Sequence, residues 1–382
     1  VAVIGVGMKR WGELWKKSLR EIWTEAALEA VDDAGVDHVD AMYVGCMSGG
    51  LFVGQEHLGA LLADQLGLGP IPGARVESAC ASGGLALRQA WMDVASGLHD
   101  VVLATGVEKM TDVDGGAATD ALASAADQEY ESYHGVTFPG LYGMMAHAHM
   151  HAHGTTRRQL SAVAAKNHRH GTLNPLAQFP MEVSVEQVEE SVLVADPLRI
   201  LDCSPITDGA AAVVLVPLGL AHTFTGRPPV RIAASAHATD SIALHERDDL
   251  AWLGSTERAA RLAYAQAGIT PEDLSFCEVH DCFTIAEIMV IEALGISPRG
   301  CGGSGAESGA TALGGKVPVN PSGGLKSKGH PVGATGIAQV REAVLQLWGE
   351  AGDRQVKDAH WGLTQNMGGT GASTAVHVFE RV

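Results

Sequence analysis

Cys80 is the first residue whose type and position could do chemistry, because it lies where a short expected strand gives way to a helix. The segment around it reads VESACASGG, and an expected helix covers residues 85–95. The dipole and the free N–H groups of a helix N-terminus favour a thiolate and can hold an oxyanion. Cys80 is therefore a candidate nucleophile, and a buried structural cysteine is the alternative.

His330 is the second candidate, within the glycine-rich segment GGLKSKGHPVGATG. A histidine beside a nucleophilic cysteine is the general base that such a thiol needs. Pro331 and a helix of small residues follow it, so a turn would present the imidazole ring at a helix start. Taken alone, the segment fits equally well a histidine that is hydrogen-bonded in the core or lies in a surface turn.

The tetrapeptide HDCF, residues 280–283, supplies two further acid–base candidates, His280 and Cys282. It follows an expected strand at residues 274–279, and the carboxyl ends of parallel strands are where α/β sheets place their ligands. A zinc site that includes Cys277 is the alternative, but its spacing matches no common zinc pattern. We therefore favour acid–base chemistry at this segment and predict no bound metal.

Two other patterns have more than one interpretation. The segment QNMGGTGAS, residues 365–373, could turn backbone N–H groups toward a ligand or form an ordinary glycine-rich turn. In the middle of the chain, histidines recur at every second position, so pairs four residues apart share a helix face. Such a face could bind a metal, and polar positions near an anionic ligand are at least as good an interpretation. These histidines are His147, His149, His151 and His153.

Strand-like apolar runs alternate with helical patterns, which predicts an α/β fold. The fully apolar run at residues 101–105 is typical of a parallel strand that is covered on both faces. Thr284 and Glu287 fit a capping box at the start of the helix after HDCF. The expected strands are residues 1–6, 42–44, 75–77, 101–105, 210–216, 230–234 and 274–279, and the expected helices are residues 18–34, 85–95, 257–267 and 284–294.

The chain divides into two halves that share a plan. Residues 112–200 interrupt the alternation and are expected to form a loop domain inserted in the first half, and residues 219–230 read as the linker. The segments that hold the cysteine and histidine candidates each combine a reactive residue, a helix that starts with small residues, and a strand. This repetition indicates a duplicated α/β unit.

Composition limits the classes of function. The chain has 382 residues, with 26 Lys or Arg against 44 Asp or Glu, and a net charge of −18. A broad nucleic-acid surface needs a basic face and does not fit this balance, whereas a small anionic ligand needs only a local cluster. We expect no membrane span, signal peptide or targeting signal. The 6 scattered cysteines, without a CxxC pair, favour a reduced cytoplasmic protein over disulfides.

The four segments, in this order, resemble those of the thiolase superfamily, and the similarity extends over essentially the whole chain. ESACASGG is similar to the nucleophile loop and GHPVGATG to the histidine loop, and VAVIGVG, ATGVEKM and DCSPITDGAAAVVL also match. The archaeal and bacterial acetyl-CoA acetyltransferases, similar to sterol-carrier-protein thiolases, are the nearest subgroup. The resemblance implies a five-layered α-β-α-β-α fold in two similar halves, residues 1–222 with the loop domain and residues 223–382.

Two departures from ordinary thiolases affect the implied site. Their Asn-Glu-Ala-Phe-like motif is replaced by HDCF, and Asn366 stands where they carry the cysteine of a C-terminal Cys-x-Gly motif. The resemblance therefore implies Cys282 as the replacement acid–base cysteine. It also implies that His330 deprotonates Cys80, which takes an acetyl group from acetyl-CoA. The acyl oxygen would lie on the backbone N–H groups of Cys80 and Gly368.

The implied second half-reaction uses another acetyl-CoA. Its thioester oxygen would lie near His330 and a water held by His280, and Cys282 would remove the α-proton. The enolate would attack acetyl-Cys80 and give acetoacetyl-CoA, and the reverse reaction is thiolysis.

The resemblance also implies a homodimer or homotetramer and CoA thioesters as substrates, with no permanently bound cofactor. The implied partner is a hydroxymethylglutaryl-CoA synthase, joined through a separate small OB-fold, zinc-ribbon scaffold protein, which would draw acetoacetyl-CoA toward the mevalonate pathway. No motif locates the CoA phosphates. The weak candidates are four basic residues of the loop domain: Arg157, Arg158, Lys166 and Arg169.

Three other functions stay open at this stage. A degradative 3-ketoacyl-CoA thiolase would use the same residues on a broader range of chain lengths. A decarboxylating ketoacyl synthase would use Cys80, His280 and His330 as a triad. Such a synthase needs no α-proton base like Cys282 and usually has Thr in place of Pro331. An inactive scaffold or lyase subunit would not need the intact cysteine and histidine.

Overall fold

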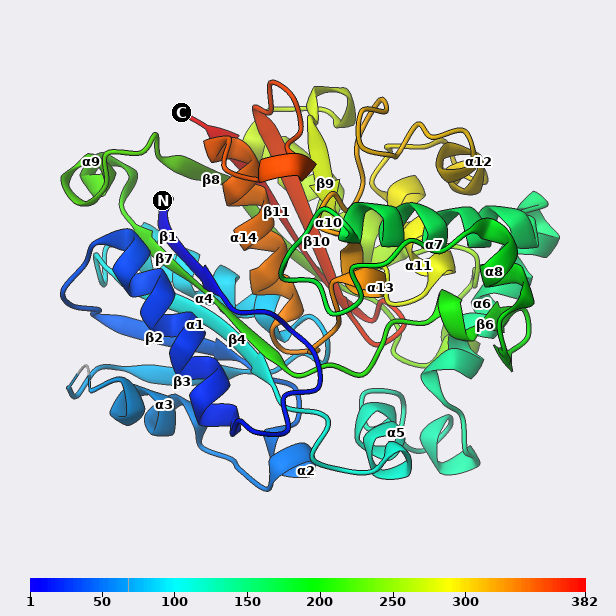
Figure 1. Cartoon of the computed structure of the whole chain (residues 1–382), viewed down its shortest axis with the longest axis horizontal. Helices are drawn as coiled ribbons and strands as arrows, with labels where there is room; N and C mark the ends of the chain where they lie inside the picture. Colours follow the sequence, from blue (N-terminus) through cyan, green and yellow to red (C-terminus); the bar gives the residue numbers. More distant parts are fainter. Residues whose placement is uncertain (68) are drawn as a thin grey trace.

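The strands form two half-sheets that meet along one edge, and the computed structural model describes residues 1–67 and 69–382 (Figure 1). The strand order is β3-β2-β4-β7-β1 in the first half-sheet and β8-β11-β10-β9 in the second. Within the described residues, the ladder that joins the two half-sheets consists of two residue pairs, both between β1 and β8. The strands are β1 (Ala2–Met8), β2 (Ala41–Gly45), β3 (Gly73–Val76), β4 (Val102–Glu108), β7 (Gly209–Val216), β8 (Val230–Thr239), β9 (Phe276–Glu278), β10 (Trp361–Gly368) and β11 (Ser373–Arg381).

Helices lie outside each half-sheet and between the two, which gives five layers. On the outer face of the first half-sheet lie α1 (Leu19–Ala34) and α3 (Leu58–Leu66), and on that of the second lie α10 (Gly254–Ala267) and α11 (Thr284–Ala293). Between them, α4 (Ser82–Ser96) and α14 (Thr335–Trp348) contact strands of both half-sheets and each other. The layered α-β-α-β-α expectation is confirmed, and the two middle helices are those of the repeated segments.

Local sequence signals explain where the first long helix begins and ends. The Ser18 hydroxyl accepts the N–H of Glu21, and the Glu21 carboxylate accepts the N–H of Ser18 in return. This reciprocal capping box satisfies two backbone donors at the N-terminus of α1. At the other end, Gly35 adopts φ 67°, a left-handed conformation that costs glycine little. The expected helix at residues 18–34 is therefore confirmed to within one residue.

The inserted region forms a helical loop domain over one end of the sheets (Figure 1). Its α7 packs on α11, α12 and α13, so the insertion is anchored to the second half. In the described part of the chain, no helix is both long and apolar enough to traverse a bilayer. The remaining elements are α2 (Gly49–Val53), α5 (Gly115–Ala123), α6 (Phe138–His153), α7 (Arg157–Gly171), α8 (Val185–Glu190), α9 (Ala221–Phe224), α12 (Gly302–Glu307), α13 (Gly324–Ser327), β5 (Leu193–Ala195) and β6 (Leu198–Arg199).

One local expectation is wrong, and another is met only in part. The capping box at the start of α11 does not form, because the Thr284 hydroxyl donates to Asp202 and the Glu287 carboxylate binds Lys166 instead. Tertiary partners have replaced the local cap, although α11 does begin directly after Phe283. The strand expected to be parallel, β4, lies in a mixed sheet, parallel to β2 and antiparallel to β7. Its apolar sequence reflects burial on both faces, which either direction of pairing allows.

Glycines permit the close approach of the loops that precede the middle helices. A Cβ added to Gly333 would lie 2.7 Å from Gly45 O, from the Cα of Cys46 and from Val107 O. All three are backbone atoms, so none of them could rotate away as a side-chain end would. The loop that holds His330 is therefore pressed directly against the ends of β2 and β4.

We predict that Gly333→Ala lowers the free energy of unfolding by about 1–3 kcal/mol, because the added methyl group overpacks this contact. Chemical denaturation measures the change. Gly115→Ala is the matched control, because it is exposed on α5 with no neighbouring atom within 4 Å of the added Cβ. Equal stability of Gly333→Ala and the wild type would contradict this account of the middle layer.

Candidate active site

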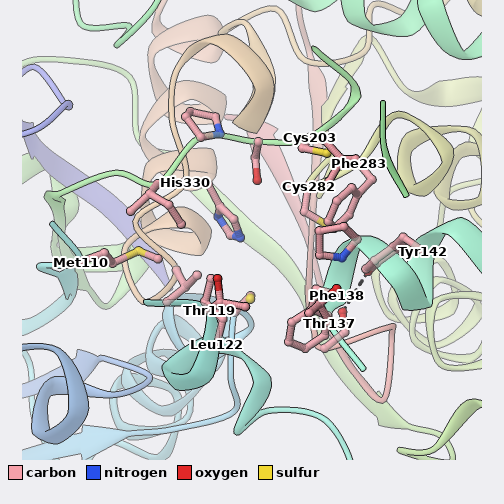
Figure 2. Close-up of a pocket in the computed structure, with 18 residues that line it drawn as sticks. Met110, Thr119, Leu122, Thr137, Phe138, Tyr142, Cys203, Cys282, Phe283 and His330 are labelled. Carbon is pink, nitrogen blue, oxygen red and sulfur yellow. Dashed lines mark hydrogen bonds between the residues drawn. The ribbon is translucent and has the colours of Figure 1, made fainter. Parts of the chain in front are cut away.

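One cavity of about 360 Å³ brings together three of the four predicted catalytic residues, Cys80, Cys282 and His330 (Figure 2). One wall comes from the loop domain and the other from the segment that leads into β7. The fourth residue, His280, lies fully buried with its ring edge against the ring of His330, at 4.9 Å between centroids. The remaining lining residues are Met110, Thr119, Leu122, Thr137, Phe138, Pro139, Tyr142, Val194, Cys203, Ser204, Pro205, Ile206, Phe283, Val332 and Gly369.

A tight turn presents Cys80 at the start of α4. Ala79 before it has φ 48°, a left-handed conformation that is strained for a residue with a side chain. The Ser82 hydroxyl stabilises the turn, accepting the N–H of Ser78 and donating to the carbonyl of Ala79. The cysteine is half-buried, and the backbone N–H of Gly369 faces its thiol.

The expectation that the helix N-terminus lowers the pKa of Cys80 is wrong. Burial raises the pKa of this thiol to about 12, and the N–H of Gly369 offsets only part of that rise. The desolvation cost of a thiolate outweighs the helix dipole here. The resting nucleophile is therefore a neutral thiol that needs a base.

His330 is placed to be that base. Its backbone N–H donates to Thr207, and its Nδ1 lies 2.7 Å from the Thr335 hydroxyl, which itself donates to the Pro331 carbonyl. Since that hydroxyl has a single proton, it must accept from Nδ1–H, which leaves a lone pair on Nε2. Burial also lowers the pKa of His330 to about 3. The ring is thus a neutral acceptor at the cavity.

Two side chains of β10 hydrogen-bond to His280. Its backbone N–H donates to the Gln365 side chain, and its Nδ1 lies 3.1 Å from Nδ2 of Asn366. Burial, and then the neighbouring His330, lower the pKa of this ring well below its ordinary value. The other ring nitrogen, Nε2, is buried and has no hydrogen-bond partner among the described residues.

Cys282 reaches the cavity directly before α11, and sequence reasoning missed its main partner. Tyr142, from α6, lies beside the Cys282 thiol, stacks on Phe283 at 4.5 Å between ring centroids and donates its hydroxyl to the carbonyl of Gly369. Burial raises the pKa of Cys282 well above its ordinary value, contrary to the expected effect of the helix start. One buried tyrosine thus joins the loop domain, the second thiol and the loop that faces Cys80.

Two further residues differ from the sequence-based picture. Cys203, which lies outside the four candidate segments of the sequence, lines the same cavity, and burial raises its pKa to about 11. The backbone N–H at the Cys80 thiol is that of Gly369, one residue beyond the predicted Gly368. A role for Gly368 stays a prediction. The DCSPIT segment, already noted for its similarity, was the signal that could have identified Cys203.

The basic candidates for CoA phosphates lie on α7, outside the cavity lining. Arg157 pairs with Asp202, and Lys166 pairs with Glu287 inside the protein. The remaining two candidates, Arg158 and Arg169, are exposed. Arg169 and Lys166 line a separate cavity of about 750 Å³.

The histidine series on α6 does not form a shared metal site. His149 is buried between Thr155 and Glu292, whereas His147 bonds to the exposed Asp196. Within the described ranges, the group that could hold a metal ion is instead Cys80, His280 and His330, whose ligand atoms all lie within 4.8 Å of one another. A thiol and two imidazoles suit zinc, so a metal here would block the nucleophile.

We predict that the rate at which iodoacetamide alkylates Cys80 rises about tenfold per pH unit between pH 7 and pH 9, because the raised pKa makes the thiolate fraction climb across this range. Peptide mass spectrometry measures the rate separately at each cysteine. The exposed Cys301 is the internal control. A rate at Cys80 that is already flat near neutral pH would indicate a resting thiolate–imidazolium pair and contradict the neutral site.

Two family models together match most of the chain. The model "Thiolase, N-terminal domain" matches residues 1–218, and the model "Thiolase C-terminal domain-like" matches residues 236–381. The acetyl-CoA acetyltransferase of Methanothermobacter thermautotrophicus is 57% identical, over 100% of this chain and 99% of that protein. Human sterol carrier protein 2 is 36% identical, over 97% of this chain and 70% of that protein.

Solved structures show the same fold. The Ltp2-ChsH2(DUF35) aldolase has a TM-score of 0.87 and 25% identity, over 100% of this chain and 97% of that chain. A monomeric SCP2-thiolase like protein from Mycobacterium smegmatis has a TM-score of 0.74 at 20% identity, over 100% of this chain and 77% of that chain. Both family models and the long, close archaeal match lead to one conclusion: the chain belongs to the thiolase family of acyltransferases.

Proposed function

We propose that the protein is an acetyl-CoA C-acetyltransferase, which condenses two acetyl-CoA molecules reversibly to acetoacetyl-CoA and CoA. The observation that carries the proposal is the convergence of the Cys80 thiol with the His280 and His330 rings within 4.8 Å, in a cavity that also holds the Cys282 thiol. A nucleophile, a base, a second acid–base group and an unpaired ring nitrogen are the parts that a Claisen condensation needs.

The first half-reaction forms acetyl-Cys80. Nε2 of His330 takes the thiol proton as sulfur attacks the thioester carbon of acetyl-CoA, and the oxyanion lies toward the backbone N–H groups of Cys80 and of the Gly368–Gly369 loop. The CoA thiolate then leaves and takes the proton from His330. His330 can accept this proton because its ring rests neutral, with Nδ1–H bonded to Thr335 and the lone pair of Nε2 free.

The second half-reaction makes a carbon–carbon bond. Cys282 passes its proton to Nε2 of His330, and the resulting thiolate removes the α-proton of a second acetyl-CoA. The enolate oxygen lies near His280 and His330, and the enolate carbon attacks the carbonyl carbon of acetyl-Cys80. The sulfur of Cys80 leaves and regains a proton from His330, so the site returns to its starting state.

The cavity supports a short acyl group. Its volume is about 360 Å³, and the aromatic rings of Phe138, Tyr142 and Phe283 bound it on one side, where they would limit the length of an acyl chain on Cys80 (Figure 2). A 3-ketoacyl-CoA thiolase of broader chain length is the second candidate, because the lining is mostly apolar. Steady-state thiolysis of acetoacetyl-CoA, compared with longer 3-ketoacyl-CoA thioesters, separates the two candidates.

A decarboxylating ketoacyl synthase has less support. Decarboxylation generates the carbanion without removing a proton, so such an enzyme has no use for a thiol base. Here Cys282 is buried and lines the same cavity as Cys80 and His330, where it could act as an acid–base group. Malonyl thioesters should therefore not replace acetyl-CoA as donor.

CoA would bind with its phosphates toward α7. Three of the four basic candidates pair with carboxylates: Arg157 and Lys166 with Asp202 and Glu287, and Arg158 with Glu186 and Glu307 at the surface. We therefore favour the exposed Arg169, which has no salt bridge among the described residues. We further propose a homo-oligomer in the cytoplasm. Since condensation of acetyl-CoA is unfavourable, we propose a partner that consumes acetoacetyl-CoA, such as a hydroxymethylglutaryl-CoA synthase joined through a separate scaffold protein. Support for a partner is that one structure of similar fold is named the Ltp2-ChsH2(DUF35) aldolase, which joins two protein names.

We predict that Cys282→Ala still forms acetyl-Cys80 but exchanges the α-protons of acetyl-CoA about 100- to 10,000-fold more slowly, since it lacks the acid–base group. Deuterium uptake from D₂O, followed by mass spectrometry of acetyl-CoA, measures the rate. Cys282→Ser is the matched control of similar size, and its hydroxyl, a far weaker acid than a thiol, should also fail. Exchange at the wild-type rate in Cys282→Ala would assign the base to His280 or His330 instead.

A further inference from the structure

The Asn366 side chain joins the nucleophile turn to His280. It lies on β10, is 1% exposed, and stands at the position where ordinary thiolases have a cysteine. Its Oδ1 accepts the N–H of Gly84 at 3.0 Å, and its Nδ2 donates to the carbonyl of Cys80 at 3.0 Å. The same Nδ2 lies 3.1 Å from Nδ1 of His280. The amide of Asn366 therefore accepts one hydrogen bond through Oδ1 and donates one through each of the two hydrogens on Nδ2.

Backbone groups determine which way this amide points. In the opposite orientation, Nδ2 would face the N–H of Gly84 and Oδ1 would face the carbonyl of Cys80, so both contacts would be repulsive. Backbone donors and acceptors cannot exchange roles, whereas side-chain hydroxyls and imidazoles can. The amide of Asn366 is thus fixed with its NH₂ group toward His280.

This orientation decides which nitrogen of His280 carries the proton. Nδ1 receives a hydrogen from Asn366, so it must be the unprotonated nitrogen. The ring is neutral, since burial and the neighbouring His330 lower its pKa. Its single proton is therefore on Nε2. That nitrogen is buried and unpartnered among the described residues, next to the point where Cys80, His280 and His330 converge.

We propose that Asn366 is a positioning residue that holds His280 in its Nε2–H tautomer, so that this N–H donates to the thioester oxygen on which the enolate charge develops. The inference rests on the proposed condensation for the identity of that oxygen. His330 has the opposite tautomer, with Nδ1–H bonded to Thr335, so the two neighbouring rings differ in role. One begins the reaction as an acceptor and the other as a donor.

The replacement of cysteine by asparagine at position 366 then has two linked effects. It removes an acid–base group from the C-terminal loop, and the amide creates a fixed donor in the HDCF segment. A neutral donor that is oriented before the substrate binds stabilises developing negative charge without reorganisation. Gln365, the neighbour on β10, accepts the backbone N–H of His280 and donates to the Thr256 hydroxyl, and among the described residues it has no bond to the His280 ring.

The tautomer is measured by NMR on full-length protein labelled with ¹⁵N-histidine, with the His280 signals assigned through the His280→Gln variant. The expected result is an unprotonated Nδ1 and a protonated Nε2 in the resting protein. In Asn366→Asp, which has the same shape but presents an acceptor, Nδ1 should gain a proton. In the control Gln365→Leu, the ring state should stay that of the wild type. Protonated Nδ1 in the wild type, or no change in Asn366→Asp, would overturn the inference.

Kinetics test whether the effect operates through His280. Asn366→Leu should slow α-proton exchange of acetyl-CoA about tenfold, a coupling typical of residues in direct contact. In a His280→Ala background the same substitution should cause no further loss. An equal loss in both backgrounds would mean that Asn366 acts by holding the Cys80 turn, and would overturn the role assigned here.

The proposed condensation and the positioning role of Asn366 can be tested separately. If the wild type neither acetylates Cys80 nor exchanges α-protons, the proposed condensation is wrong, and the NMR result alone decides whether Asn366 sets the tautomer. If the wild type does both but Nδ1 of His280 is protonated, the condensation stands and the positioning role is wrong.

Discussion

Desolvation is the constraint on which the rest of the site depends. Burial raises the pKa values of Cys80 and Cys282 and lowers those of His280 and His330, so all four reactive groups rest uncharged. In such a site, proton positions are decided by hydrogen bonds to groups that cannot titrate. The Thr335 hydroxyl sets the proton of His330, and the amide of Asn366 is oriented by backbone atoms. A charge then develops only when a thioester is present to be attacked.

Buried hydrogen bonds hold the loops that carry these uncharged groups. A second buried group, the Glu108 carboxylate, accepts the N–H groups of Met47, Ser48 and Gly333 and the thiol of Cys46. It therefore fixes the His330 loop to the segment after β2, where glycines allow backbone to touch backbone. These four donors offset part of the cost of burying the carboxylate, and burial still raises the pKa of Glu108. Tyr142 joins the loop domain to the loop beside Cys80 in a similar way, by donating its hydroxyl to the carbonyl of Gly369.

Much of this arrangement could be predicted from the sequence, because it is encoded locally. Ser18, Glu21 and Gly35 define α1, and the apolar runs define the strands. Three other features could not be predicted, because each depends on residues that are far apart in the chain. They are the directions of the pKa shifts, the role of Tyr142 and the capping of α11. Thr284 fits a local cap, yet its hydroxyl bonds Asp202, which is 82 positions away. The boundary between halves near residues 222 and 223 stays a prediction.

Covalent trapping tests the central claim, that Cys80 is the nucleophile of this site, most directly. Wild-type protein is incubated with acetyl-CoA, treated with iodoacetamide, digested and analysed by peptide mass spectrometry. The account predicts one acetyl group on the peptide that contains Cys80, with alkylation blocked at that residue, while the exposed Cys301 is still alkylated. An acetyl group on Cys203 or Cys282, with Cys80 free to react with iodoacetamide, would contradict it.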